Sequence, residues 1–134
     1  MRRYPSDPVV WTNALFLVNG GLWYESGEIL AATSVAIAGI SSMVYHWHRE
    51  TVRWAHRLDY VAAFTAAVTT LYTSKLTLLG YFLIALLMGV GLSFKIEAHA
   101  YGRDRYYDGY HVAWHLSVFA AQLILLISLH TEFV

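Results

Sequence analysis

Apolar residues run in long blocks along this chain, and short polar stretches separate the blocks. A membrane-spanning helix needs about 20 predominantly apolar residues. Five segments have this length or come close to it: about 8–24, 28–47, 57–73, 76–94 and 109–130. The pattern therefore predicts an all-α fold, a polytopic transmembrane helix bundle of about five spans. Because the connections must be short, we expect one domain over residues 1–134.

The composition supports this prediction. The chain is 57% hydrophobic and 13% charged, whereas soluble domains are about 45–50% apolar and about 25% charged. The formal net charge is zero and no basic stripe is present, so we expect no nucleic-acid partner. The chain contains no cysteine, which excludes disulfides, thiolate metal sites and a cysteine nucleophile.

Several residues mark the ends and packing faces of the predicted helices. Asp7 before Pro8 predicts an N-cap with proline at the first helical position, and we expect Ser26 to cap the second helix and Asp108 the fifth. Aromatic residues gather where the spans should meet the lipid head groups: Trp23, Tyr24, Tyr45, Trp47, Trp54, Tyr101, Tyr106, Tyr107 and Tyr110. Four small residues are interpreted as helix-packing positions: Ala32, Ala36, Gly89 and Gly91.

The positions of lysine and arginine predict the topology. With five spans, one side of the membrane holds the N-terminus and the 48–56 and 95–108 loops. That side, with its margins, carries Arg2, Arg3, Arg49, Arg53, Arg57, Lys95, Arg103 and Arg105, and the other side carries only Lys75. Positively charged residues favour the cytoplasmic side. The N-terminus is therefore predicted to be cytoplasmic and the C-terminus to be outside.

Ionisable residues near the predicted span ends are candidate functional residues, because charge inside a membrane is costly. His46 closes the second span, Asp59 opens the third, and His111 and His115 begin the fifth. The predicted topology puts all four at the cytoplasmic end. His111 and His115 are four residues apart, so they project from one helix face, and Ser42 has the same relation to His46. Three imidazoles with an open fourth position are a known catalytic zinc geometry.

The residues by themselves leave alternatives open. A histidine pair of this spacing on a membrane helix can also ligate haem, as in a membrane cytochrome, or hydrogen-bond to neighbouring helices. His56 is a rival metal ligand because it lies one turn before Asp59. The remaining histidines are interpreted as structural: His48, His99 and His130.

Three motifs together resemble the CREST superfamily, which includes alkaline ceramidases, adiponectin and progestin receptors, and hemolysin III proteins. The motifs are SSMVYH at 41–46, RLDY at 57–60 and HVAWH at 111–115. The family pattern is a serine four residues before a histidine, an aspartate opening the next helix, and H-x-x-x-H in the final helix. The first two motifs look most like hemolysin III, and the third looks most like an alkaline ceramidase.

This resemblance implies a zinc ion (Zn²⁺) held by His46, His111 and His115, with Ser42 and Asp59 beside it. It further implies hydrolysis of a membrane lipid amide that is ceramide-like. In that reaction Asp59 acts as the general base, and Ser42 donates a hydrogen bond to the developing oxyanion. The alternative within the same family is a receptor or scaffold that keeps zinc for structure.

The chain departs from the family in its number of helices. The family has seven, and this chain has room for about five. The missing pair would lie between the aspartate helix and the final helix, so the final helix still enters the membrane from the cytoplasmic side. Lipid or a second copy of the chain must then close the site, and a homodimer is the simplest such assembly.

Overall fold

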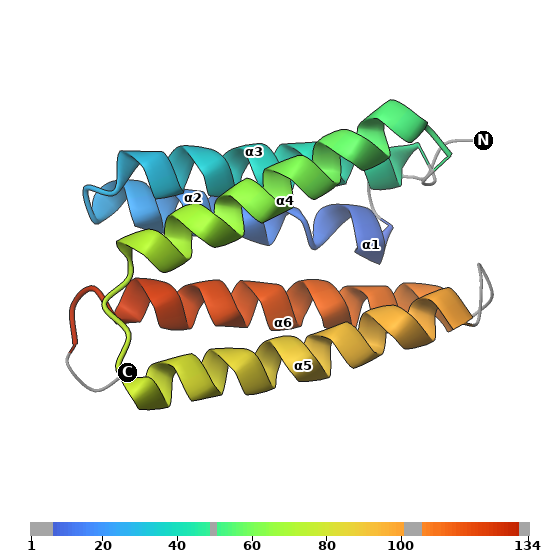
Figure 1. Cartoon of the computed structure of the whole chain (residues 1–134). Helices are drawn as coiled ribbons and strands as arrows, with labels where there is room; N and C mark the ends of the chain where they lie inside the picture. Colours follow the sequence, from blue (N-terminus) through green and yellow to red (C-terminus); the bar gives the residue numbers. More distant parts are fainter. Residues whose placement is uncertain (1–6, 49–50, 101–105, 132–134) are drawn as a thin grey trace. The chain divides into compact units, whose positions relative to one another are not determined.

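The computed structural model describes residues 7–48, 51–100 and 106–131, and over these ranges the regular structure is α-helical (Figure 1). The chain divides into two compact units, Met1–Thr73 and Ser74–Val134. The single domain predicted for residues 1–134 stays a prediction. The helices of the first unit are α1 (Pro8–Trp11), α2 (Ala14–Glu25), α3 (Ile29–Trp47) and α4 (Arg53–Thr73), and those of the second are α5 (Leu78–Ala100) and α6 (Tyr107–Ile127).

Glycines bring α2 and α3 into close contact in the first unit. A Cβ added to Gly39 of α3 would lie 3.0 Å from the Cβ of Phe16, and one added to Gly20 of α2 would lie 3.1 Å from the carbonyl oxygen of Ala32. Small residues allow membrane helices to approach each other in this way. The packing role predicted for Ala32 is confirmed, because this residue is buried at the contact.

The second face of α3 packs against α4. Ala62, Ala66 and Thr70 of α4 are buried, and they recur at intervals of four residues along one face of the helix. The hydroxyls of Ser34 on α3 and Thr69 on α4 form a hydrogen bond of 2.5 Å. Helix α3 is therefore the central helix of the first unit.

The first predicted span, 8–24, is not one continuous helix. Its start is as predicted, because the Asp7 carboxylate accepts a hydrogen bond of 3.3 Å from the backbone N–H of Val9. The helix is then interrupted between α1 and α2, where the Asn13 side-chain amide donates to the Val9 carbonyl at 2.8 Å. Asparagine side chains compete with backbone donors in this way. The interruption therefore comes from a polar residue inside an apolar block.

The second unit is the helical hairpin of α5 and α6. A Cβ added to Gly91 of α5 would lie only 2.8 Å from the Cβ of Ser117 on α6, whereas one added to Gly89 would have no atom of the described residues within 4 Å. The predicted packing role is thus confirmed for Gly91 and wrong for Gly89. The Lys95 ammonium lies 4.9 Å from the centre of the Trp114 ring, so a cation–π contact also joins the two helices.

Two of the predicted helix caps are wrong. Ser26 ends α2 instead of starting α3, because its hydroxyl donates a hydrogen bond of 3.0 Å to the carbonyl of Leu22, one turn earlier in α2. The N-cap of α3 is Glu28. Asp108 lies inside the first turn of α6, whose N-cap is Tyr106.

Three of the described helices are long and apolar enough to cross a membrane: α3, α5 and α6. Helix α2 has 12 residues and is about 18 Å long at 1.5 Å per residue, which is shorter than a hydrocarbon core of about 30 Å. Helix α4 has 21 residues but begins with three charged side chains, Arg53, Arg57 and Asp59. The five predicted spans are therefore matched by three candidate spans.

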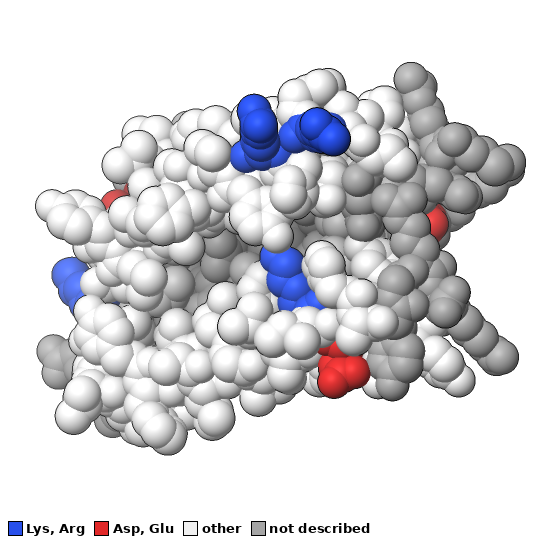
Figure 2. All heavy atoms as spheres, turned by 45° about the vertical axis from the view of Figure 1, so that its right-hand side comes forward, with Lys and Arg blue, Asp and Glu red and all other residues white. Residues whose placement is uncertain are grey.

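The surface of the described residues is also largely uncharged. On the face drawn in Figure 2, only a few lysine, arginine, aspartate or glutamate side chains interrupt the neutral surface. Large apolar side chains are exposed along α4 and α5, such as Phe64, Leu79 and Phe82. This surface is typical of helices that contact lipid. Some residues of the predicted aromatic and basic sets lie outside the described ranges: Arg2, Arg3, Arg49, Tyr101, Arg103 and Arg105.

Candidate metal centre

Helix α6 holds two histidines one turn apart on a buried face. His111 and His115 are 5% and 4% exposed. Their ring centroids lie 4.8 Å apart and their planes are perpendicular. The spacing of four residues produces this arrangement, because side chains at i and i+4 lie above one another on a helix. The predicted pair is therefore brought together by α6 alone.

His46 lies in the last turn of α3 and is 1% exposed. The aromatic residues around it belong to the junction of α3 with α4. The Tyr45 ring lies 5.1 Å from the ring of His46 and 5.1 Å from that of His56, and the ring of His56 lies 4.6 Å from that of Tyr60. The end of α3 and the first turns of α4 are therefore held together by aromatic contacts.

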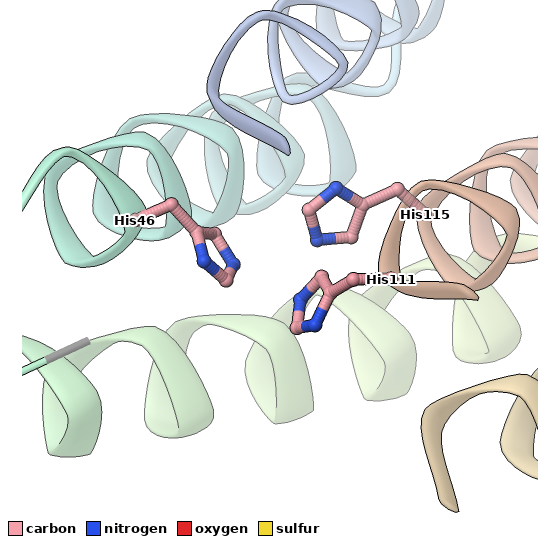
Figure 3. Close-up of side chains that lie close together, drawn as sticks. All are labelled: His46, His111 and His115. Atoms are coloured by element: carbon pink, nitrogen blue, oxygen red, sulfur yellow. The ribbon is translucent and has the colours of Figure 1, made fainter. Parts of the chain in front are cut away.

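The three histidines form a group that can bind a metal ion. Ring nitrogens of His46, His111 and His115 all lie within 4.8 Å of one another, and all three residues are buried (Figure 3). Nitrogens that share a tetrahedral ion at about 2.0–2.1 Å lie about 3.3 Å apart. The ring nitrogens of the group lie within 4.8 Å of one another, and three imidazoles are a donor set that a metal ion can bind.

The type of donor atom limits which metal ions this group can bind. Imidazole nitrogen suits zinc, copper, iron and nickel, whereas magnesium and calcium prefer oxygen ligands. The group contains no carboxylate and the chain has no cysteine. Three protein ligands also leave one tetrahedral position for a water or substrate atom, as catalytic zinc sites do.

The other predicted site residues, Ser42 and Asp59, lie on α3 and α4. Ser42 is half-buried on α3, one turn before His46, and Asp59 is half-buried on α4, directly before Tyr60. The α4 residue that contacts α3 is His56, whose ring lies 5.1 Å from that of Tyr45, and Asp59 follows it within one turn of α4. The catalytic roles of Ser42 and Asp59 stay predictions.

His56, the rival ligand, is not a member of the three-histidine group. Its side chain is exposed and is in ring contact with Tyr45 and Tyr60. These contacts give His56 a packing role at the α3–α4 junction. His46 is the histidine of α3 that belongs to the group.

The structure adds one residue, Tyr107, to the surroundings of the histidines. Tyr107 was predicted to lie among the aromatic residues at the head groups, but it is 4% exposed. Its ring centroid lies 5.1 Å from that of His111. The available signal was its position four residues before His111, which places both on one face of α6.

No protein-family model, curated protein or solved structure matches this chain. The resemblance to the CREST superfamily therefore depends on the three short motifs quoted above. The three-histidine group is an observation that does not depend on that resemblance.

Proposed function

We propose that this chain is an integral membrane zinc hydrolase that cleaves a lipid amide. The observation that carries the proposal is the group of three buried histidines, His46, His111 and His115. Three imidazole ligands with an open fourth position favour zinc in a catalytic form over a closed structural site. Zinc bound there would supply Lewis-acid chemistry, polarising the amide carbonyl and increasing the acidity of water.

In this reaction Asp59 of α4 transfers the proton, and Ser42 of α3 stabilises the developing negative charge. The Asp59 carboxylate accepts a proton from the attacking water and then gives it to the departing amine. The new C–O bond replaces the C–N bond, and the products are a carboxylic acid and an amine. The Ser42 hydroxyl donates a hydrogen bond to the carbonyl oxygen while negative charge develops on it.

A lipid is the substrate class that suits the surroundings of this site. Helix α6, which carries two of the three histidines, is long and apolar enough to span a membrane, and so is α3, which carries the third. A lipid amide such as ceramide places its acyl chain in the bilayer and its amide near the head groups. The distribution of lysine and arginine supports a site at the cytoplasmic end.

The sidedness and the assembly are parts of the same proposal. Because the chain has no cysteine, single cysteines at positions 53 and 75 give clean labelling. We expect position 53 to react only from the cytoplasmic side and position 75 only from outside, and the reverse result contradicts the topology.

A homodimer encloses the site, and mass photometry in nanodiscs that shows monomer at every concentration contradicts this assembly.

Metal analysis of the purified protein tests the central proposal. We expect about one zinc per chain, and we expect His111→Ala to lose most of it because an incomplete ligand shell remains. His48→Ala and His130→Ala are matched controls that should keep the metal. Full zinc occupancy in His111→Ala contradicts the ligand set, and a Soret band in the visible spectrum indicates haem instead.

Hydrolysis of a fluorescent ceramide tests the reaction itself. The zinc-loaded wild type should release the fatty acid, and removal of zinc with a chelator should stop the release. Re-addition of zinc should restore it. If the protein binds zinc but cleaves no lipid amide, the result favours the alternative function, a receptor or scaffold in which zinc is structural.

A further inference from the structure

We infer that Tyr107 is a positioning residue of the metal centre, whose ring holds the imidazole of His111 in its ligating orientation. The inference deepens the proposed function and rests on metal binding by His111. It does not depend on which lipid is cleaved.

Tyr107 continues the face of α6 that carries the two histidines. Tyr107, His111 and His115 follow at intervals of four residues, and all three are at most 5% exposed. The Tyr107 and His111 ring centroids are 5.1 Å apart with planes inclined by 40°. The His111 and His115 centroids are 4.8 Å apart with planes inclined by 90°. The His111 ring is therefore in contact with an aromatic ring on each neighbouring turn.

The neighbouring tyrosine shows that this burial is specific to one position. Tyr106 is 60% exposed, whereas Tyr107 is 4% exposed. Tyrosine at the start of a membrane helix is ordinarily placed at the head groups, with its hydroxyl in water. Tyr106 follows this rule and Tyr107 does not. The orientation of Tyr107 toward His111 is thus a property of the histidine face.

Ring contact matters for metal binding because the imidazole can rotate about its last side-chain torsion. A ligand ring that is already held near the ligating orientation loses less conformational freedom when the ion binds. Many metal-binding histidines are oriented by a hydrogen bond to a second residue, and loss of that residue typically costs about 10–100-fold in metal affinity. For His111 the Tyr107 ring provides this orientation by packing.

The ring and the hydroxyl of Tyr107 can be separated by substitution. Tyr107→Phe keeps the ring, so we expect zinc affinity within about 3-fold of the wild type. Tyr107→Ala removes the ring, and we expect zinc affinity to fall by about 10–100-fold. Tyr107→Leu keeps apolar volume without a flat ring, and we expect at least about 10-fold loss. Tyr106→Ala is the matched control and should bind zinc as the wild type does.

The test measures zinc affinity by chelator competition, and the absorption spectrum of Co²⁺ bound in place of zinc. We expect the Co²⁺ bands of Tyr107→Leu to shift and broaden, and those of Tyr107→Phe to match the wild type. Circular dichroism and the thermal midpoint of the metal-free proteins report whether each variant folds. If Tyr107→Leu folds and binds zinc as tightly as the wild type, the inference is wrong although the metal site stands. If the wild type itself binds no zinc, the proposed function fails first and this inference fails with it.

Discussion

Helices α3 and α5 are both long and apolar enough to cross a membrane, yet they differ in how far the protein encloses them. Half of the residues in the most apolar stretch of α3 are buried, against 11% in α5. Helix α3 packs against α2 on one side and α4 on the other, whereas α5 packs against α6. The two helices show that hydropathy identifies a candidate span but does not indicate which spans can carry buried polar side chains.

Enclosure explains which polar groups each helix carries. The buried residues of α3 include Ser34, Ser41 and His46, and those of α5 are the apolar or small residues Gly80, Ile84, Gly91 and Ala98. A polar side chain at membrane depth needs protein partners, because lipid offers no hydrogen bonds. A helix covered on two sides provides them. Helix α3 can therefore hold buried polar residues such as His46, whereas the buried face of α5 packs against α6.

The largest effect is expected for Asp59→Asn in α4, which tests the general-base role proposed for this residue. Asparagine is nearly isosteric and still forms hydrogen bonds, but it accepts no proton at neutral pH. General acid–base assistance is worth about 10²–10⁴-fold, or about 3–5 kcal/mol of barrier. We expect kcat for ceramide hydrolysis to fall by this factor, with smaller changes in KM and zinc content. If Asp59 only stabilises the start of α4, turnover stays near that of the wild type.

Ser42→Ala in α3 tests the second catalytic role with a smaller expected effect. Loss of one hydrogen bond to a developing oxyanion is expected to lower kcat by about 10–10³-fold. The neighbouring Ser41→Ala is the matched control, because the Ser41 hydroxyl donates to the Ala38 carbonyl within α3. Equal kcat for Ser42→Ala and the wild type removes Ser42 from the mechanism.

The sequence predicts a helix well where hydropathy alone determines the extent of that helix. The predicted segment 28–47 agrees with the helix Ile29–Trp47, within which no Asp, Glu, Lys or Arg interrupts the apolar pattern. Helix α5 extends past the predicted end of the fourth span near residue 94, because Lys95 and Glu97 continue the helix to Ala100. Helix propensity does not exclude these residues. Hydropathy alone locates the apolar part of a helix and can miss its polar extension.

The candidate site was predictable in part for a similar reason. The pairing of His111 with His115 follows from helical spacing, which is local. The association of His46 with them depends on tertiary structure, and charge topology predicted only that all three lie at one end. The Tyr107 contact was missed because an aromatic residue near a span end also satisfies the head-group rule. Only burial separates Tyr107 from Tyr106.

A glycine pair on α5 tests the packing role of this helix. Gly91→Ala places a Cβ 2.8 Å from the Cβ of Ser117, and overpacking of this kind costs about 1–3 kcal/mol. In the described part of the chain, the new Cβ of Gly89→Ala meets no atom within 4 Å, and alanine is favoured over glycine inside a helix by about 0.5–1 kcal/mol. The free energy of unfolding, measured by reversible unfolding in mixed micelles, should therefore fall for Gly91→Ala and rise for Gly89→Ala. The same sign for both contradicts the α5–α6 contact at Gly91.

The smallest expected effect concerns the hydrogen bond between Ser34 of α3 and Thr69 of α4. One of the two hydroxyls donates its single hydrogen across the pair. Each also lies beside a backbone acceptor on its own helix, to which it can donate when the partner is removed: Ser34 Oγ lies 2.9 Å from the Ala31 carbonyl oxygen, and Thr69 Oγ1 lies 2.9 Å from the Thr65 carbonyl oxygen. Removal of one partner therefore leaves the other satisfied, and no buried polar group is stranded. Hydrogen bonds between membrane helices average about 0.6 kcal/mol in double-mutant cycles. We expect Ser34→Ala, Thr69→Val and the double variant to give a coupling of this size in the free energy of unfolding. A coupling above about 2 kcal/mol would mean that the backbone acceptors do not compensate, and that this bond does more than small-residue packing to hold α3 against α4.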